Sequence, residues 1–336
     1  MMESQFLPEI DPELDYQYNN TNWLIKTREP GCFGDGAIKH LISLLLKQSE
    51  LSRSLFSDRG VFRVPFSDDI VLEEDGFGEY SFDWFPPANR SVLPANIVVY
   101  IHGGYWKSIG WRECSHWALP IVNADCIFVS LAYKLAPKEK LEFMPQCLCL
   151  GMQKVIHLTQ KMFSQQDVKK LNITLVGHSA GAHLILEMIH HAQKQAAANE
   201  NWLTSLRNLV LISGVYDLRP IIRTNVNKAL KLKSVEEAWC VSPIRHFTQD
   251  DVSVLLQKPL HWLVAWTEYE SPAIQKQSKV LIEMLDEASK RNKQFTYESL
   301  CIENEDHFTI ILGLHSGSNS SRMLKKILQL TNNTYN

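Results

Sequence analysis

The chain alternates short, continuous apolar runs with longer amphipathic stretches, a pattern typical of a parallel sheet covered by helices. Amphipathic patterns such as residues 142–163 and 272–290 predict helices, and the second begins with Ser271 as N-cap and Pro272 in its first turn. The apolar runs predict buried strands at residues 97–101, 126–131, 173–176, 209–212, 260–266 and 295–301. The sequence therefore predicts an α/β fold with a mostly parallel central sheet and helices on both faces.

We predict a single domain over residues 1–336. Three further regions of the chain add to its central sheet and helices. Residues 1–60 are polar and helical in character and predict an N-terminal helical extension on the outside of the domain. Short alternating stretches at 70–72 and 80–84 predict antiparallel edge strands. Residues 218–258 contain no core strand, and an insertion of this length predicts a small helical cap over a pocket.

The most informative motif is Gly177-His178-Ser179-Ala180-Gly181, which lies between a predicted strand and a predicted helix. In that context a G-x-S-x-G pattern predicts a strained turn that presents the serine hydroxyl, because flanking glycines let the strand and the helix approach closely. Ser179 is therefore the candidate nucleophile. The alternative is a chance match, which the flanking strand and helix patterns disfavour.

A serine hydroxyl becomes a nucleophile near neutral pH when a histidine accepts its proton and a carboxylate orients that histidine. His307 follows the last predicted strand, late in the chain, where this arrangement requires its histidine. Two carboxylates, Glu270 and Asp217, follow the ends of other predicted strands. We favour Glu270, which stands before a helix in the usual position of the acid, and keep Asp217 as the alternative acid. Glu268 is expected to point away.

An oxyanion hole needs hydrogen-bond donors at the place where negative charge develops on the carbonyl oxygen. The amide after the nucleophile, that of Ala180, is one expected donor, and the amides of Gly103 and Gly104 at the end of a buried strand are the others. The residues that flank this glycine pair are expected to contact the substrate: His102, Tyr105 and Trp106. For the two aromatic residues, core packing is the alternative role.

The composition is that of a globular protein, with 45% hydrophobic and 21% charged residues and a net charge of −3. The absence of long basic runs disfavours nucleic acid as a partner. The N-terminus lacks the features of a signal peptide, and no segment approaches the ~20 apolar residues of a membrane span, so we expect a cytoplasmic protein away from membranes. Seven scattered cysteines without a C-x-x-C pair predict reduced thiols and no zinc site.

Three motifs together resemble the kynurenine formamidase (arylformamidase) family: HGGYW at residues 102–106, GHSAGAH at 177–183 and DHF at 306–308. Residues 18–23 are similar to the amino-terminal segment of that family, so the resemblance spans most of the chain. It implies an α/β-hydrolase fold and a cytosolic serine hydrolase, often a homodimer, that works without a cofactor or metal. The implied reaction removes formate from the small molecule N-formyl-L-kynurenine in tryptophan catabolism.

One position departs from this family, because Glu270 stands before Ser271-Pro272 where the family carries an aspartate. Glutamate serves as the acid in some α/β-hydrolases, and its extra methylene requires a shifted loop. Two other functions stay open. One is a general short-chain carboxylesterase of the hormone-sensitive-lipase-like type. The other is a non-catalytic binding protein with the hydrolase fold, and the presence of Ser179 and His307 disfavours this second alternative.

Overall fold

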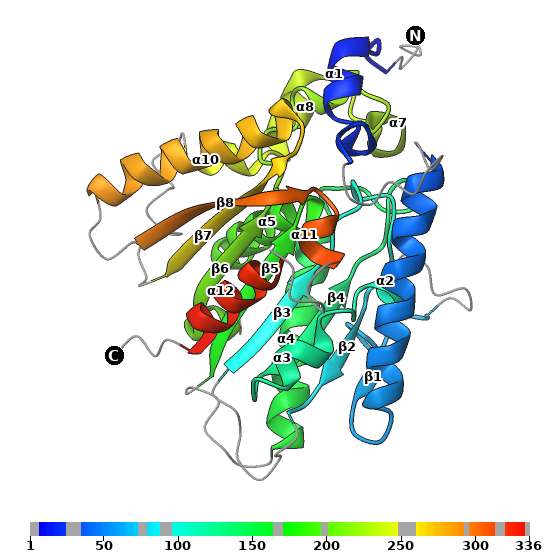
Figure 1. Ribbon diagram of the computed structural model, residues 1–336, viewed down its shortest axis with the longest axis vertical. Coiled ribbons are helices and arrows are strands. Elements are labelled where there is room, and N and C mark those ends of the chain that lie inside the picture. The colour runs from blue at the N-terminus through cyan, green and yellow to red at the C-terminus, as the bar shows by residue number, and fades with distance from the viewer. Residues whose placement is uncertain are drawn as a thin grey trace.

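The computed structural model describes residues 7–24, 35–72, 79–87, 96–163, 171–195, 201–247, 260–291, 296–312 and 320–332. Its centre is an eight-stranded sheet in the order β1-β2-β4-β3-β5-β6-β7-β8 (Figure 1). The strands are β1 Val61–Pro65, β2 Ser81–Phe85, β3 Asn96–Ile101, β4 Ile127–Ala132, β5 Asn172–His178, β6 Leu206–Ile212, β7 His261–Tyr269 and β8 Thr296–Asp306. The pairs β1-β2 and β2-β4 are antiparallel. The remaining neighbours in this order, from β4-β3 to β7-β8, are parallel. The predicted mostly parallel sheet is confirmed.

The central strands read as continuous apolar runs because both faces of the sheet are covered. In β3 the side chains of Ile97, Val99 and Ile101 belong to the core on one face. Val98 and Tyr100 belong to a second core on the other face. Successive side chains of a strand point to opposite faces, so a strand buried on both sides needs apolar residues at every position.

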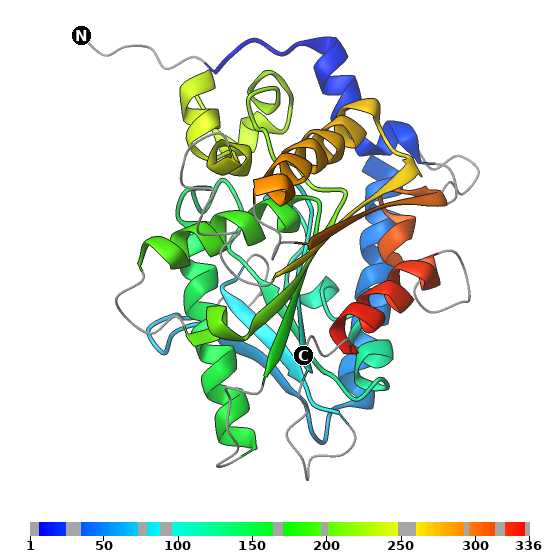
Figure 2. The same cartoon turned by 90° about the vertical axis from the view of Figure 1, so that its left-hand side faces the viewer.

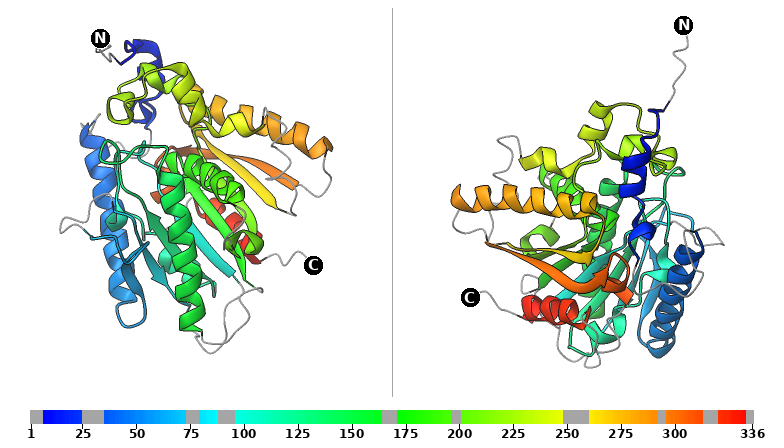
Figure 3. Two further views of the ribbon diagram at one scale, coloured as in Figure 1. Left: turned by 180° about the vertical axis from the view of Figure 1, so that it is seen from behind. Right: turned by 45° about the horizontal axis from the view of Figure 1, so that its top comes forward.

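Helices cover both faces of the sheet, as Figure 1 and the rear view in Figure 3 show. The first core lies under α4 Met144–Met162, α5 Ala180–Lys194, α6 Asn201–Ser205 and α10 Pro272–Arg291. The second core lies under α2 Asp35–Leu55, α3 Ala118–Val122, α11 Thr309–Leu312 and α12 Ser320–Asn332. The prediction of helices on both faces is confirmed.

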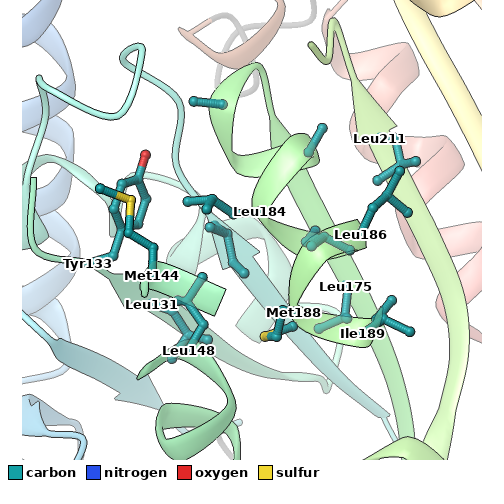
Figure 4. Packing of buried hydrophobic residues seen from close by; sticks show 14 of the residues in the cluster. Leu131, Tyr133, Met144, Leu148, Leu175, Leu184, Leu186, Met188, Ile189 and Leu211 are labelled. Atoms are coloured by element: carbon teal, nitrogen blue, oxygen red, sulfur yellow. The ribbon is translucent and has the colours of Figure 1, made fainter. Parts of the chain in front are cut away.

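Helix α5 is deeply packed and carries the residues that follow the candidate nucleophile. Leu184 and Met188 on α5 are fully buried, as are Leu175 on β5 and Leu131 on β4 (Figure 4). Burying such a side chain stabilises the fold by about 1.5–3 kcal/mol. The start of α5 is therefore held rigidly against the sheet.

The last helix, α12, returns to the beginning of the central strands. The Asn208 side-chain amide donates to the Leu330 carbonyl at 3.2 Å, and the Thr331 hydroxyl lies 3.1 Å from that of Thr174. The side chain of Asn96 donates to that of Asn332 at 3.0 Å. These bonds join the C-terminal helix to the ends of β3, β5 and β6 opposite the candidate site.

The segment between β6 and β7 is helical, as the sequence predicts. It contains η4 Ile221–Arg223, α7 Asn227–Leu230, α8 Val235–Cys240 and η5 Pro243–Phe247, whereas residues 248–258 of the predicted cap lie outside the described residues. Beside it lie α1 Pro12–Gln17 and η1 Asn20–Trp23 from the N-terminal region (Figure 2). In the part of the chain that the structure describes, no helix combines the length and apolar character needed to cross a membrane.

One predicted strand is wrong. Residues 70–72 are not in a strand, and Val71 is 90% exposed. The antiparallel edge strand is β1. It pairs with one side of β2, and β4 pairs with the other side of β2. A β-prone stretch without a neighbouring strand has no partner for its backbone hydrogen bonds and does not form a strand.

Candidate active site

Ser179 lies at the turn between β5 and α5 in a conformation that few residues adopt, with φ 54° and ψ −115°. Its amide donates to the carbonyl of Ile212 at 2.8 Å, which ties the turn to β6. The flanking glycines are sterically required. A Cβ at Gly177 would lie 2.6 Å from the amide nitrogen of Ala182, and one at Gly181 would lie 2.0 Å from the carbonyl oxygen of Ile101. The strained serine is therefore held by the close approach of strand and helix.

His307 and Glu270 form a buried pair at the carboxyl ends of β8 and β7. Nδ1 of His307 donates to Oε1 of Glu270, and both residues are 3% exposed. The second carboxylate oxygen, Oε2, accepts from the Ser213 hydroxyl at 3.1 Å and from the Thr267 amide at 3.4 Å. A proton on Nδ1 leaves Nε2 of the neutral imidazole as an acceptor, the tautomer that a general base needs.

The other carboxylates considered from the sequence have different partners. Asp217 forms an ion pair with Arg219 at 2.7 Å and caps its amide at 3.0 Å. Glu268 is exposed and accepts from the amide of Asn304 at 2.8 Å, so it points away as expected. Of the candidate acids, the structure brings Glu270 to the histidine and leaves Asp217 in its local capping role.

The glycine pair after β3 lies directly against the serine. A Cβ at Gly103 would meet Nδ1 of His178 at 2.9 Å and Cβ of Ser179 at 3.0 Å. Gly104 has φ +101°, and a Cβ there would lie 2.2 Å from the carbonyl oxygen of Ser108. Ala180 is the first residue of α5, and the first amides of a helix have no acceptor within it. The backbone of Gly103 and the amide of Ala180 thus lie beside Ser179, with Gly104 next in the chain.

His102 is part of the support of this loop. Its ring stacks on that of Tyr133 with centroids 4.2 Å apart, and its Nδ1 donates to the carbonyl of Gly103 at 2.8 Å. Burial lowers the pKa of His102 to about 4, so the ring is neutral near pH 7. The His102 side chain is 1% exposed, as is Ser179, and its contact with the substrate stays a prediction.

Trp106 packs in the core, which was the alternative to its expected place in a pocket wall. It is fully buried in the core, and its indole nitrogen donates to Nδ1 of His183 on α5 at 3.2 Å. His183 in turn donates from Nε2 to the carbonyl of Val241 at 2.7 Å. Packing, the alternative role, is the one that the structure shows. Tyr105 is half-buried, and its hydroxyl donates to the carbonyl of Tyr18 at 2.6 Å.

Two residues of the site were missed by sequence reasoning. His178, the first variable residue of the G-x-S-x-G motif, donates from Nε2 to the carbonyl of His307 at 2.8 Å, and the centroids of the two rings are 4.7 Å apart. Burial, followed by the nearby His307, lowers the pKa of His178 well below 6.5, so this bond is made by a neutral ring. The other is Ser213, whose only signal is its place at the end of a predicted strand.

A cavity of about 210 Å³ lies between α5, the start of α4 and the cap segment. It is lined by Leu141, His183, Glu187, Val241 and Arg245, among others, and Ser179 and His307 are not part of its wall. The residues that the sequence singled out for catalysis are therefore gathered elsewhere, at the carboxyl edge of the sheet.

Comparisons with known proteins agree with this fold. Residues 98–294 match the model of a family described as having the alpha/beta hydrolase fold. A kynurenine formamidase of Danio rerio is 29% identical over 299 residues, which cover 89% of each chain. One of Salmo salar is 29% identical over 305 residues, 91% of this chain and 92% of the relative. The solved structure of a putative thioesterase from Silicibacter sp. TM1040 shares the fold, with TM-score 0.65 and 23% identity over 92% of this chain and 98% of its own.

Proposed function

The chain belongs to the family with the alpha/beta hydrolase fold, and we propose that it is a serine hydrolase that removes formate from N-formyl-L-kynurenine to give L-kynurenine. The observation that carries the hydrolase mechanism is the buried His307–Glu270 pair next to a serine held in a strained turn. The substrate follows from the two fish kynurenine formamidases, which align with about nine-tenths of this chain.

In the proposed mechanism Ser179 attacks the formyl carbon while Nε2 of His307 accepts the hydroxyl proton. Glu270 keeps the other proton on Nδ1 and stabilises the imidazolium that forms. The amides of Gly103, Gly104 and Ala180 are proposed to receive the oxyanion. Collapse of the tetrahedral intermediate breaks the carbon–nitrogen bond, and the imidazolium proton passes to the leaving aniline nitrogen. Water then attacks the formyl-serine ester, which releases formate and restores the serine.

The crowding around the nucleophile favours a small acyl group. Ser179 is 1% exposed, and the backbone of Gly103 lies so close that an added methyl group would reach Cβ of Ser179 at 3.0 Å. A formyl group is the smallest acyl group, whereas a long acyl chain needs an open channel beside the serine. We therefore propose that formyl anilides are hydrolysed better than short esters, and short esters better than long ones.

The test compares kcat/KM for N-formyl-L-kynurenine, p-nitrophenyl acetate and p-nitrophenyl decanoate. Ser179→Ala is the matched control, and we expect its kcat to fall by roughly 10⁴ to 10⁶ without a change in melting temperature. An ester preferred over the formyl anilide by tenfold or more, about 1.4 kcal/mol, would reassign the protein as a carboxylesterase. Turnover by the folded Ser179→Ala protein at the wild-type rate would exclude the mechanism.

Four further proposals concern the domain organisation, the compartment, the pathway and the assembly. We propose that residues 1–336 act as one hydrolase domain with residues 1–60 as its N-terminal extension and about 218–258 as its cap. We further propose that the protein works in the cytoplasm, in tryptophan breakdown, and as a homodimer. Sedimentation equilibrium of the purified chain tests the last point, with a mass near twice 38.6 kDa as the expected result.

A further inference from the structure

The N-terminal residues 11–24, here called the brace, contact the cap and α10. The amide of Asp11 donates to the carbonyl of Arg223 at 2.8 Å. The carboxylate of Asp15 accepts from both the backbone amide and the side chain of Asn225, at 2.7 and 2.6 Å. On α10, the side chain of Gln277 donates to the Tyr18 hydroxyl at 2.9 Å. The brace is thus fixed along its length by hydrogen bonds to later parts of the chain.

The brace also reaches the two loops that bear the candidate catalytic groups. Tyr105, next to the glycine pair, donates from its hydroxyl to the carbonyl of Tyr18 at 2.6 Å, and Asn20 interacts with the same hydroxyl. At the other end Leu24 is buried in a small apolar cluster against which Phe308, the neighbour of His307, packs. A segment remote in sequence therefore touches both sides of the site.

The loop that follows β3 needs such support because its backbone is strained. Gly104, Tyr105 and Trp106 all have positive φ, at 101°, 50° and 58°. A non-glycine residue in this region costs on the order of 1 kcal/mol and persists only where the surroundings enforce it. Trp106 is held through His183 on α5, and Tyr105 is held by the brace.

We propose that the brace is a positioning element of the active site, which acts through the Tyr105–Tyr18 hydrogen bond to keep the amides of the glycine pair directed at Ser179. This inference rests on the proposed serine-hydrolase function. Tyr105 is then a positioning residue, since its hydroxyl is engaged with the brace. The brace stabilises the loop in the conformation that the oxyanion requires, so its loss weakens transition-state binding and leaves substrate binding unchanged.

The test compares Tyr105→Phe, which removes the hydroxyl and keeps the ring, with Tyr16→Phe, which alters a 51%-exposed tyrosine of the same brace. We expect kcat of Tyr105→Phe to fall roughly threefold to tenfold, the net effect of one hydrogen bond, with KM within twofold. Its affinity for an aryl boronic acid, which forms a tetrahedral adduct on serine, should fall by the same factor. A second variant, Tyr18→Phe, loosens the brace from Gln277 and should shift kcat in the same direction.

Hydrogen exchange at the amides of residues 103–106 supplies a readout that does not depend on turnover. We expect faster exchange there in Tyr105→Phe than in Tyr16→Phe. A rise in the KM of Tyr105→Phe at constant kcat would show that Tyr105 contacts the substrate and would overturn the inference. Unchanged kcat together with unchanged hydrogen exchange would overturn it as well. A wild-type protein without activity on formyl anilides or esters would refute the proposed function alone, and the exchange measurement would then decide whether the brace holds the loop.

Discussion

Replacing Glu270 by glutamine tests the acid most directly, because the structure fixes how the new amide would lie. Thr267 presents a backbone N–H to Oε2 of Glu270 at 3.4 Å, and an N–H can only donate. The carbonyl oxygen of the glutamine must therefore face Thr267, and its NH₂ group must face Nδ1 of His307. Nδ1 then has to accept, so the proton moves to Nε2 and the histidine can no longer receive the proton of Ser179.

The expected loss in kcat is about 10⁴, the magnitude associated with the wrong tautomer of a catalytic histidine. Steady-state hydrolysis of N-formyl-L-kynurenine measures it, with the melting temperature as a check on folding. Asp217→Asn is the matched control, because Asp217 pairs with the exposed Arg219 and should give nearly normal turnover. Glu270→Gln with activity within tenfold of the wild type, or a crippled Asp217→Asn, would refute this assignment.

Three further predictions concern residues of the site and of the surrounding fold. Gly103→Ala should lower kcat by about 10² to 10³, because the new Cβ would lie 3.0 Å from that of Ser179 and displace an oxyanion donor. Burial lowers the pKa of His183 from 6.5 to about 4, so unfolding takes up a proton and stability falls as the pH drops from 6.5 towards 4. In urea titrations His183→Gln should reduce this slope by about 1.4 kcal/mol per pH unit; an unchanged slope would contradict the pKa. Arg245→Ala should destabilise by about 3 kcal/mol, since it leaves the buried Glu187 carboxylate with His246 as its remaining ion-pair partner, whereas Arg219→Ala at an exposed pair should cost less than about 1 kcal/mol. Equal losses in the last two would show that burial does not strengthen the Arg245 pair.

The parts of the fold that the sequence predicts are those set by local pattern. Apolar runs mark the parallel strands because burial on both faces demands them, and the G-x-S-x-G motif marks the turn because its glycines are sterically required. The stretch at residues 70–72 shows the limit of this reasoning. Its composition suits a strand, but whether a strand forms depends on a free neighbour in the sheet, which the local sequence does not contain.

The candidate site shows the same division. Ser179, His307 and Glu270 can be picked out because each follows a predicted strand, and such ends meet at one edge of a parallel sheet. The role of His178 depends on the carbonyl of His307, 129 residues later, and no spacing rule connects them. The choice between the two roles of Trp106 likewise depends on a distant residue, because its indole nitrogen bonds His183 on α5 and the ring lies in the core.

The docking of α12 has a consequence for the order in which the protein becomes a catalyst. Its bonds to Asn96, Thr174 and Asn208 close loops of more than a hundred residues, and contacts this remote form late because the entropy of loop closure opposes them. His307 lies on the stretch of chain between β8 and this helix. Because β8 ends at Asp306, a nascent chain that has completed its sheet already has His307 beside Glu270, and the docking of α12 then fixes the opposite ends of β3, β5 and β6.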